Sequence, residues 1–244
     1  MNSEGTSAAK IADSTICWSC GAPSGSGHFC EACGKIQPLA RETNHFAFLG
    51  LPRKLTIDPE ALERRFHQLS WKLHPDNFTR ASECEREMAL ARSSQLNDAF
   101  RALRDPVSRV EYLLSSAGMR REGQHKQQAP PELLEEVFEL NESLDELREG
   151  RPSDGGAARN SEETAAVRRK LEAARLNFED RLGQVDGELE RLFSKWDKTL
   201  AAGGVTPGAG DEQKKLMARM NETLNRRSYI RNLVASVQKE LEEA

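Results

Sequence analysis

The sequence predicts a mainly α-helical protein built from small modules. Apolar residues recur three or four positions apart over long stretches, which is the spacing of amphipathic helices. Charged residues make up 30% of the chain and aromatic residues only 6%, and Val and Ile are sparse, so a broad β-sheet is disfavoured. The 244 residues are enough for one large domain or two to three small ones.

The first 33 residues contain two C-x-x-C-G units, nine residues apart, with the cysteines Cys17, Cys20, Cys30 and Cys33. Each unit can form a tight turn that aims two thiolates at one point, because Gly21 and Gly34 allow the chain to reverse. Four sulfurs suit one structural zinc ion in a closed tetrahedral site. We therefore expect a tetracysteine zinc module over residues 17–40, after a disordered segment over residues 1–16.

Other uses of these cysteines stay open at this stage. Iron would satisfy the same four ligands as zinc. Two disulfides are disfavoured in a reducing compartment, and a thioredoxin-like pair at Cys17 and Cys20 would need a strand before it. His28 lies between the two units and is treated as a loop residue, because four cysteines already fill the shell of the ion.

A helical hairpin is predicted after the cysteines. Asp58 and Pro59 have the residue types of a helix cap and a first helical position. The helix carries one apolar stripe, formed by Leu62, Phe66, Leu69 and Leu73. It must end near Leu73, because Pro75 disfavours helix at the residue before it. A second helix is predicted over residues 82–103, and a third begins at Asp105-Pro106.

The loop between the first two of these helices begins His74-Pro75-Asp76. This tripeptide, with the flanking residues 71–78 and 96–106, resembles the DnaJ-like J-domain, which would cover residues 44–115. In that family the loop and the basic face of the preceding helix contact an ATP-driven chaperone of the 70-kDa heat-shock class and stimulate its ATP hydrolysis. The resemblance therefore implies a chaperone-binding site made of His74, Pro75, Asp76, Arg64, Arg65 and Lys72. An ordinary solvated face is the alternative for the three basic residues.

The last half of the chain predicts a three-helix bundle over residues 131–244, after a linker over residues 116–130. Residues 131–150 hold eight acidic residues and one basic residue. Helices are predicted over residues 131–147, 161–202 and 211–242. Because each has one apolar stripe, the three helices should bury these stripes against one another.

The order of cysteine module, divergent J-domain and helical bundle resembles the iron–sulfur cluster co-chaperones of the HscB type. In such proteins an apolar and acidic face of the bundle binds the iron–sulfur scaffold protein. The resemblance implies a scaffold-binding face made of Leu134, Phe138, Glu139, Glu142, Glu146 and, from the last helix, Tyr229. Family members often have an apolar residue where Glu135 stands, so we expect that contact to be altered.

The predicted function is that of a co-chaperone that stimulates the chaperone ATPase and delivers the scaffold protein to it. No catalytic acid–base pair, nucleophile triad or phosphate-binding glycine loop is visible, so we expect neither an enzyme nor a bound nucleotide. The alternatives are a general J-domain co-chaperone for other clients, a thiol oxidoreductase, and a nucleic-acid-binding zinc protein. The last would need a basic stripe with aromatic residues, whereas the net charge is −4.

The sequence also predicts a cytoplasmic protein with no membrane or nucleic-acid partner. No apolar run approaches the roughly 18 residues of a membrane-spanning helix. The first 15 residues lack both the apolar core of a signal peptide and the Arg-rich, acid-poor character of a transit peptide.

Overall fold

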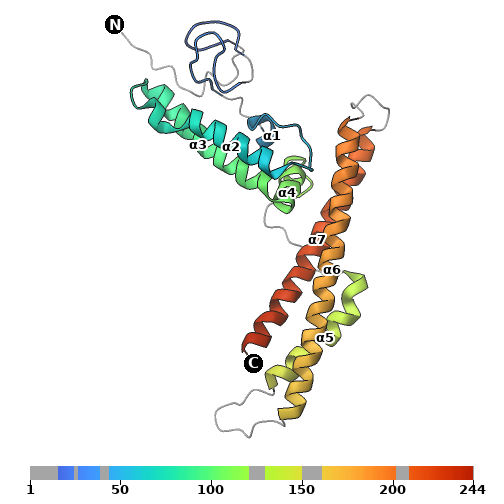
Figure 1. Ribbon diagram of the computed structural model, residues 1–244. Helices are drawn as coiled ribbons and strands as arrows, with labels where there is room; N and C mark the ends of the chain where they lie inside the picture. The colour runs from blue at the N-terminus through green and yellow to red at the C-terminus, as the bar shows by residue number, and fades with distance from the viewer. Residues whose placement is uncertain are drawn as a thin grey trace. The chain divides into compact units, whose positions relative to one another are not determined.

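A computed structural model describes residues 16–24, 27–38, 44–120, 130–149, 161–201 and 209–243. The chain divides into two compact units, Met1–Tyr112 and Leu113–Ala244. Both are helical, and the described residues contain only isolated β-bridges in place of strands (Figure 1). This confirms the mainly α fold class. Most of the segment expected to be disordered, residues 1–16, and the middle of the expected linker, residues 116–130, lie outside the described residues.

The cysteine module at the start of the first unit consists of two matching turns. Gly21 and Gly34 both have φ +71°, the left-handed conformation that glycine adopts without strain. Each glycine N–H donates to the carbonyl of the first cysteine of its unit, at 3.0 Å for Cys17 and 2.9 Å for Cys30. Isolated antiparallel bridges, Ile16 to Pro23 and Phe29 to Ile36, close the two turns.

The rest of the first unit is a helical hairpin with short flanking helices. The helices are α1 (His45–Phe48), α2 (Pro59–Leu73), α3 (Glu83–Arg104) and α4 (Pro106–Ser116), which crosses the boundary between the units. The caps fall where the sequence predicts them. The Asp58 carboxylate accepts from the N–H of Glu60 at 3.1 Å, and Asp105 accepts from the N–H of Ser108 at 2.7 Å.

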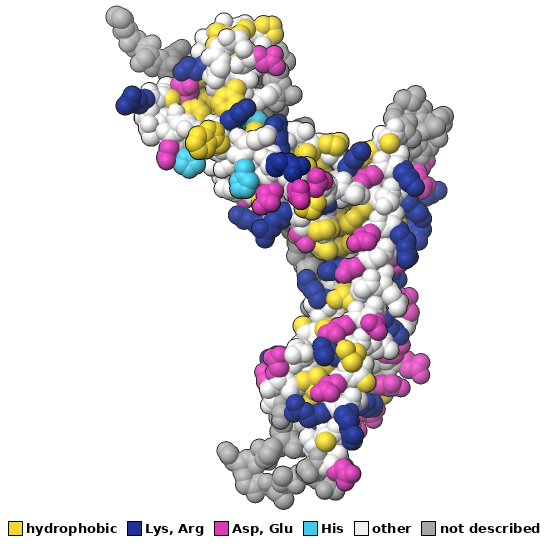
Figure 2. Space-filling view, viewed as in Figure 1, with side chains coloured by type: hydrophobic (Ala, Val, Ile, Leu, Met, Phe, Trp, Pro, Cys, Tyr) yellow, Lys and Arg dark blue, Asp and Glu magenta, His cyan; other side chains and the backbone are white. Residues whose placement is uncertain are grey.

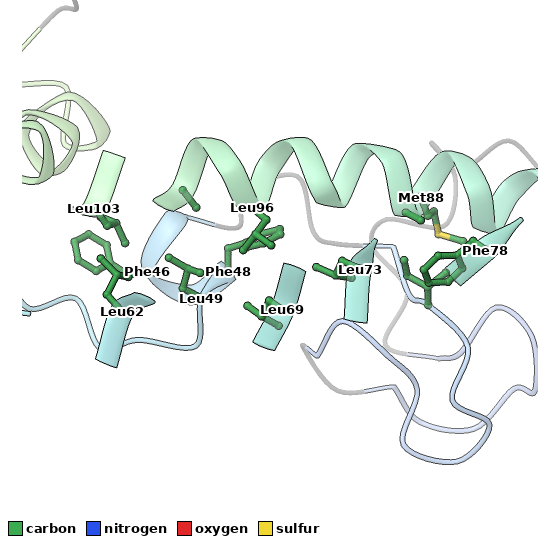
Figure 3. Close-up of a cluster of buried hydrophobic side chains, with 13 residues drawn as sticks. Phe46, Phe48, Leu49, Leu62, Leu69, Leu73, Phe78, Met88, Leu96 and Leu103 are labelled. Atoms are coloured by element: carbon green, nitrogen blue, oxygen red, sulfur yellow. The ribbon is translucent and has the colours of Figure 1, made fainter. Parts of the chain in front are cut away.

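The core of this unit lies between α2 and α3 and is extended by α1 (Figure 3). Its members include Phe46, Phe48, Leu49, Leu62, Leu69, Leu73, Phe78, Met88, Leu96 and Leu103. Ile36 of the cysteine module belongs to the same cluster and is fully buried. The module therefore packs on the hairpin.

The second unit contains a short turn, η3 (Pro131–Leu133), followed by α5 (Leu134–Glu149), α6 (Ser161–Ala201) and α7 (Ala209–Glu243). The two long helices α6 and α7 lie side by side, and α5 packs on α6 (Figure 1). The three helices share one apolar core, which includes Leu140, Leu144, Leu147, Leu171, Phe178, Ile230 and Val237. This is the predicted three-helix bundle.

Ion pairs between helices accompany that core. Arg148 of α5 lies 2.5 Å from Glu240 of α7, and Arg227 of α7 lies 2.5 Å from Asp186 of α6. On the face of the bundle seen in Figure 2, basic and acidic side chains are mixed over much of the surface, and basic side chains gather along one edge. Among the described helices, none combines the length and apolar character of a membrane span.

Candidate functional sites

The His74-Pro75-Asp76 tripeptide forms an exposed corner at the end of α2. His74 ends the helix with an extended backbone, at φ −61° and ψ 129°, and η2 (Pro75–Phe78) follows at once. The Nδ1 atom of His74 accepts from the N–H of Asp76 at 3.3 Å and lies 3.5 Å from the Asp76 carboxylate. The side chains of His74 and Asp76 are 55% and 84% exposed. The corner thus presents an imidazole and a carboxylate to solvent on a short, proline-restricted turn.

Two hydrogen bonds from Asn77, and one buried side chain on each side, hold the corner in place. The Asn77 amide donates to the carbonyl of Trp71 at 2.6 Å, and the Asn77 N–H donates to the carbonyl of His74 at 3.0 Å. Leu73 before the corner and Phe78 after it are both buried in the hairpin core (Figure 3). The backbone is therefore anchored while the polar side chains remain free to contact another molecule.

The three basic residues predicted on α2 are not equivalent in the structure. Arg64 and Lys72 are exposed, and Arg64 lies 3.3 Å from Glu60 and 3.7 Å from Asp58. Arg65 is half-buried, and its Nε donates to the carbonyl of Leu49 at 2.9 Å. Arg64 and Lys72 are eight positions apart and share one helix face, whereas Arg65 is directed towards α1.

Trp71 is a further exposed residue near the corner that the sequence did not single out. It is 81% exposed and lies one turn before the corner, on the face that carries Arg64 and Lys72. The signal that could have found it is its position outside the apolar stripe of α2. Exposed tryptophans are enriched among residues that dominate protein interfaces.

The four cysteines of the first module converge on one point. Their sulfurs all lie within 4.8 Å of one another, with 3.7 Å between Cys17 and Cys33 and 3.8 Å between Cys20 and Cys30. In a tetrahedral site with metal–sulfur bonds of about 2.3 Å, the sulfurs are separated by about 3.8 Å. The four residues are therefore placed to bind one metal ion.

The ionisation of these thiols also fits a metal site. Burial would raise the pKa of Cys17, but hydrogen bonds from the N–H groups of Cys20 and Ser19 and from neighbouring thiols lower it to about 6. The N–H of Lys35 would lower the pKa of Cys33, but burial and the three neighbouring sulfurs raise it to about 12. Four thiolates this close together repel one another, so a cation between them is required to stabilise all four.

The first half of α5 exposes apolar side chains among carboxylates. Leu134 and Phe138 are 55% and 72% exposed, and Glu139, Glu142 and Glu146 are exposed as well. Leu134, Phe138, Glu142 and Glu146 are spaced four residues apart and so follow one stripe along the helix. Tyr229 of α7 differs from them, because it is partly buried and packs against the bundle core. Burial raises the pKa of its hydroxyl.

His28 has more contacts than expected of a loop residue. It lies in a bend, but its Nε2 is 2.9 Å from the carbonyl of Phe48 and its Nδ1 is 2.8 Å from the Arg92 guanidinium. Burial lowers its pKa, as do the charges of Arg92 and Arg65, although the bond to Phe48 opposes them. The ring is thus neutral and serves as a contact between the cysteine module and the hairpin.

Comparisons with known proteins agree with this arrangement. The chain is 39% identical over 115 residues to the co-chaperone protein HscB homolog of Vibrio vulnificus strain YJ016. The aligned region covers 47% of this chain and 67% of that protein. It is 32% identical over 156 residues to the homolog of Aliivibrio salmonicida, which covers 64% of this chain and 91% of the relative. The chain belongs to the HscB co-chaperone family.

Solved HscB structures share the fold. The crystal structure of human HscB matches with a TM-score of 0.57 at 22% identity, over 92% of this chain and 98% of that chain. HscB from Vibrio cholerae matches with a TM-score of 0.51 at 25% identity, over 82% and 99%. The chain matches no family model.

Proposed function

We propose that this HscB-family protein stimulates the ATPase of a 70-kDa heat-shock-class chaperone and delivers an iron–sulfur scaffold protein to it. The observation that carries the proposal is the exposure of two different surfaces on two separate units. The first unit presents His74 and Asp76 on an anchored turn. The second presents Leu134 and Phe138 among carboxylates. One chain with both surfaces raises the local concentration of client at the chaperone.

In the proposed mechanism the protein carries out no covalent chemistry. Arg64 and Lys72 guide the acidic surface of the chaperone towards α2 by charge, and the adjacent corner then binds. Contact with His74 and Asp76 shifts the chaperone towards its hydrolysing state, because a ligand favours whichever state it binds more tightly. Hydrolysis would then trap the client that the bundle has brought.

The scaffold-binding face is proposed to be the stripe from Leu134 to Glu146, together with Tyr229 of α7. An apolar centre at Leu134 and Phe138 with a carboxylate rim has the anatomy of a protein interface. The exposed Glu135 adds one more carboxylate to this surface. The rim favours a scaffold whose contact surface is apolar and flanked by basic residues.

We further propose that the cysteine cluster holds zinc as a structural ion. Its four sulfurs belong to Cys17, Cys20, Cys30 and Cys33 and have the spacing of a closed tetrahedral site. A filled shell of this kind leaves no free thiol pair, which disfavours a thiol oxidoreductase. Elemental analysis of the purified protein distinguishes zinc from iron.

The substitution His74→Gln tests the proposal for the corner. It should abolish stimulation of the chaperone ATPase and leave scaffold affinity unchanged, because the side chain is exposed and lies outside the bundle. Arg101→Gln is the control, since Arg101 is an exposed residue of the same unit on α3, outside α2 and the corner. Full stimulation by His74→Gln would refute the proposal. Stimulation of the ATPase by a wild-type protein that binds unfolded chains and no scaffold would favour a general J-domain co-chaperone.

A further inference from the structure

The cysteine module is joined to the hairpin by an apolar contact. Ile36 is fully buried in the core formed by α1, α2 and α3, and Trp18 and Phe29 pack against the same cluster. The Trp18 indole N–H donates to the carbonyl of Ile36 at 2.7 Å. These contacts attach both cysteine turns to the helices that carry the His74–Asp76 corner.

Buried polar side chains also connect the cysteine module to the hairpin. Arg92 of α3 is 3% exposed, and its guanidinium bonds both His28 and the carbonyl of Gln37. The Gln37 side chain, also 3% exposed, donates to the sulfur of Cys17 at 3.3 Å. Gln37 and Arg92 therefore connect Cys17, one of the four cysteines, to the middle of α3.

A second connection reaches the start of α3. Lys35, two residues after Cys33, has its ammonium 2.9 Å and 3.0 Å from the two carboxylate oxygens of Glu85. Glu85 is 5% exposed and forms a capping box with Ser82, whose N–H and hydroxyl both donate to the same carboxylate. Burial would raise the pKa of Glu85, but Lys35 and Ser82 lower it below its usual value.

This capping box lies directly after the corner. The turn η2 ends at Phe78, and Ser82 begins the cap of α3 four residues later. The N–H of Ala81 donates to the carbonyl of Phe78 at 2.9 Å, which ties the intervening segment to the corner. The position of Glu85 thus helps to determine the backbone conformation of the segment between the corner and α3.

We propose that the metal-loaded cysteine module positions the chaperone-activating corner through Lys35 and Glu85. The ion fixes the turn that contains Cys33 and Gly34, and that turn fixes where the Lys35 ammonium lies. Lys35 then holds Glu85 and the first turn of α3, which anchors the corner from its C-terminal side. Lys35 is a positioning residue, and the consequence for ATPase stimulation rests on the proposed function above.

Hydrogen exchange on the full chain tests the proposal without any partner. The protein is compared with zinc(II) bound and after removal of zinc by a chelator under reducing conditions, with zinc content measured in both. Exchange of amides in residues 76–88 should become roughly tenfold faster without zinc, the loss expected for a hydrogen-bonded charge pair. Residues 209–243 of the bundle should not change. Unchanged exchange over residues 76–88, or equal loss of protection throughout α1, α2 and α3, would overturn the proposal.

The substitution Lys35→Met separates the ion pair from the metal. It should retain zinc, because the four sulfurs are intact, yet show the same faster exchange over residues 76–88. Lys35→Arg should restore protection, and Lys54→Met is the control because Lys54 is an exposed lysine of the same unit.

In the ATPase assay Lys35→Met should lower maximal stimulation several-fold with little change in the half-saturating concentration. Normal exchange in Lys35→Met would refute the proposal even if the protein activates the chaperone. An exchange response in a protein that activates no chaperone would refute only the proposed function.

Discussion

The two units of this protein obtain their stability in different ways. The bundle consists of long helices whose apolar stripes pack together, and its ion pairs are partly exposed or, for Arg148 and Glu240, half-buried. The hairpin unit has shorter helices and adds a cysteine module, a buried arginine and a half-buried salt bridge around them. Both units have an apolar core, but among the described residues the two buried arginines, Arg92 and Arg109, belong to the unit that carries the His74–Asp76 corner. The comparison indicates that the shape of the first unit depends on buried polar contacts as well as on apolar packing.

Removal of the metal should have the largest effect, and this effect should be confined to the first unit. Residues 16–38 contain little apolar core of their own, so the proposed ion would supply much of the free energy that folds them. We expect zinc removal to abolish hydrogen-exchange protection in residues 16–38 and to leave the thermal midpoint of the bundle unchanged. Retained protection of both cysteine turns in zinc-free protein would show that the module folds without an ion.

Arg92→Ala should be the most damaging single substitution among the polar contacts. The buried guanidinium bonds His28 and the carbonyl of Gln37, and burial lowers its pKa to about 10. Its loss leaves buried acceptors unpaired, which costs about 3 kcal/mol of unfolding free energy. The matched change in the bundle is Arg226→Ala, whose partly exposed pairs with Glu188 and Glu132 should contribute about 1 kcal/mol or less. Equal losses in urea unfolding would contradict the difference between the units.

Phe138→Ala should lower scaffold affinity by about 2 kcal/mol, roughly thirtyfold, with little effect on stability. The ring is 72% exposed, so its removal opens no cavity in the bundle core. Leu176→Ala is the control, because Leu176 is a 55% exposed apolar residue of α6 outside the proposed face. Calorimetric titration with the scaffold and thermal unfolding distinguish the two effects. Equal loss of affinity in both variants would place the binding face elsewhere on the bundle.

A change of pH should produce the smallest effect, confined to the first unit. Burial lowers the pKa of His45, which stacks on Tyr112, although the Asp98 carboxylate opposes the shift. The unfolded chain then takes up a proton near pH 6.5 that the native state does not bind. Stability should therefore fall as the pH drops below about 6.5 and level off below the native pKa. Burial also lowers the pKa of His28, which contributes to the same slope. His45→Phe should therefore reduce the slope in part in urea unfolding with excess zinc, and an unchanged slope would exclude His45 as a source.

The helices and the exposed corner could be predicted because local chemistry determines them. Asp58 and Asp105 stand before prolines that begin α2 and α4, and Pro75 ends α2. The exposure of Leu134 and Phe138 also follows from their place beside the apolar stripe of α5. The two C-x-x-C units are sufficient to predict the convergence of four sulfurs, because each turn is built from adjacent residues.

The contacts between distant segments could not be predicted. Arg65 and Arg64 are neighbours with the same charge, yet only Arg65 is drawn to the carbonyl of Leu49. Lys35 and Glu85 are 50 residues apart, and nothing in either sequence neighbourhood indicates the other. Such pairs depend on how the module docks on the hairpin, which periodicity and spacing do not specify.

The ATPase activity of the cognate chaperone, measured with and without the scaffold protein, tests the proposed co-chaperone function most directly. Wild-type protein should stimulate hydrolysis alone and more strongly when scaffold is present. His74→Gln should give no stimulation in either condition, whereas Phe138→Ala should keep the basal stimulation and lose the added effect of scaffold. Loss of both effects in both variants, or scaffold synergy that survives Phe138→Ala, would contradict a division of labour between the corner and the bundle face.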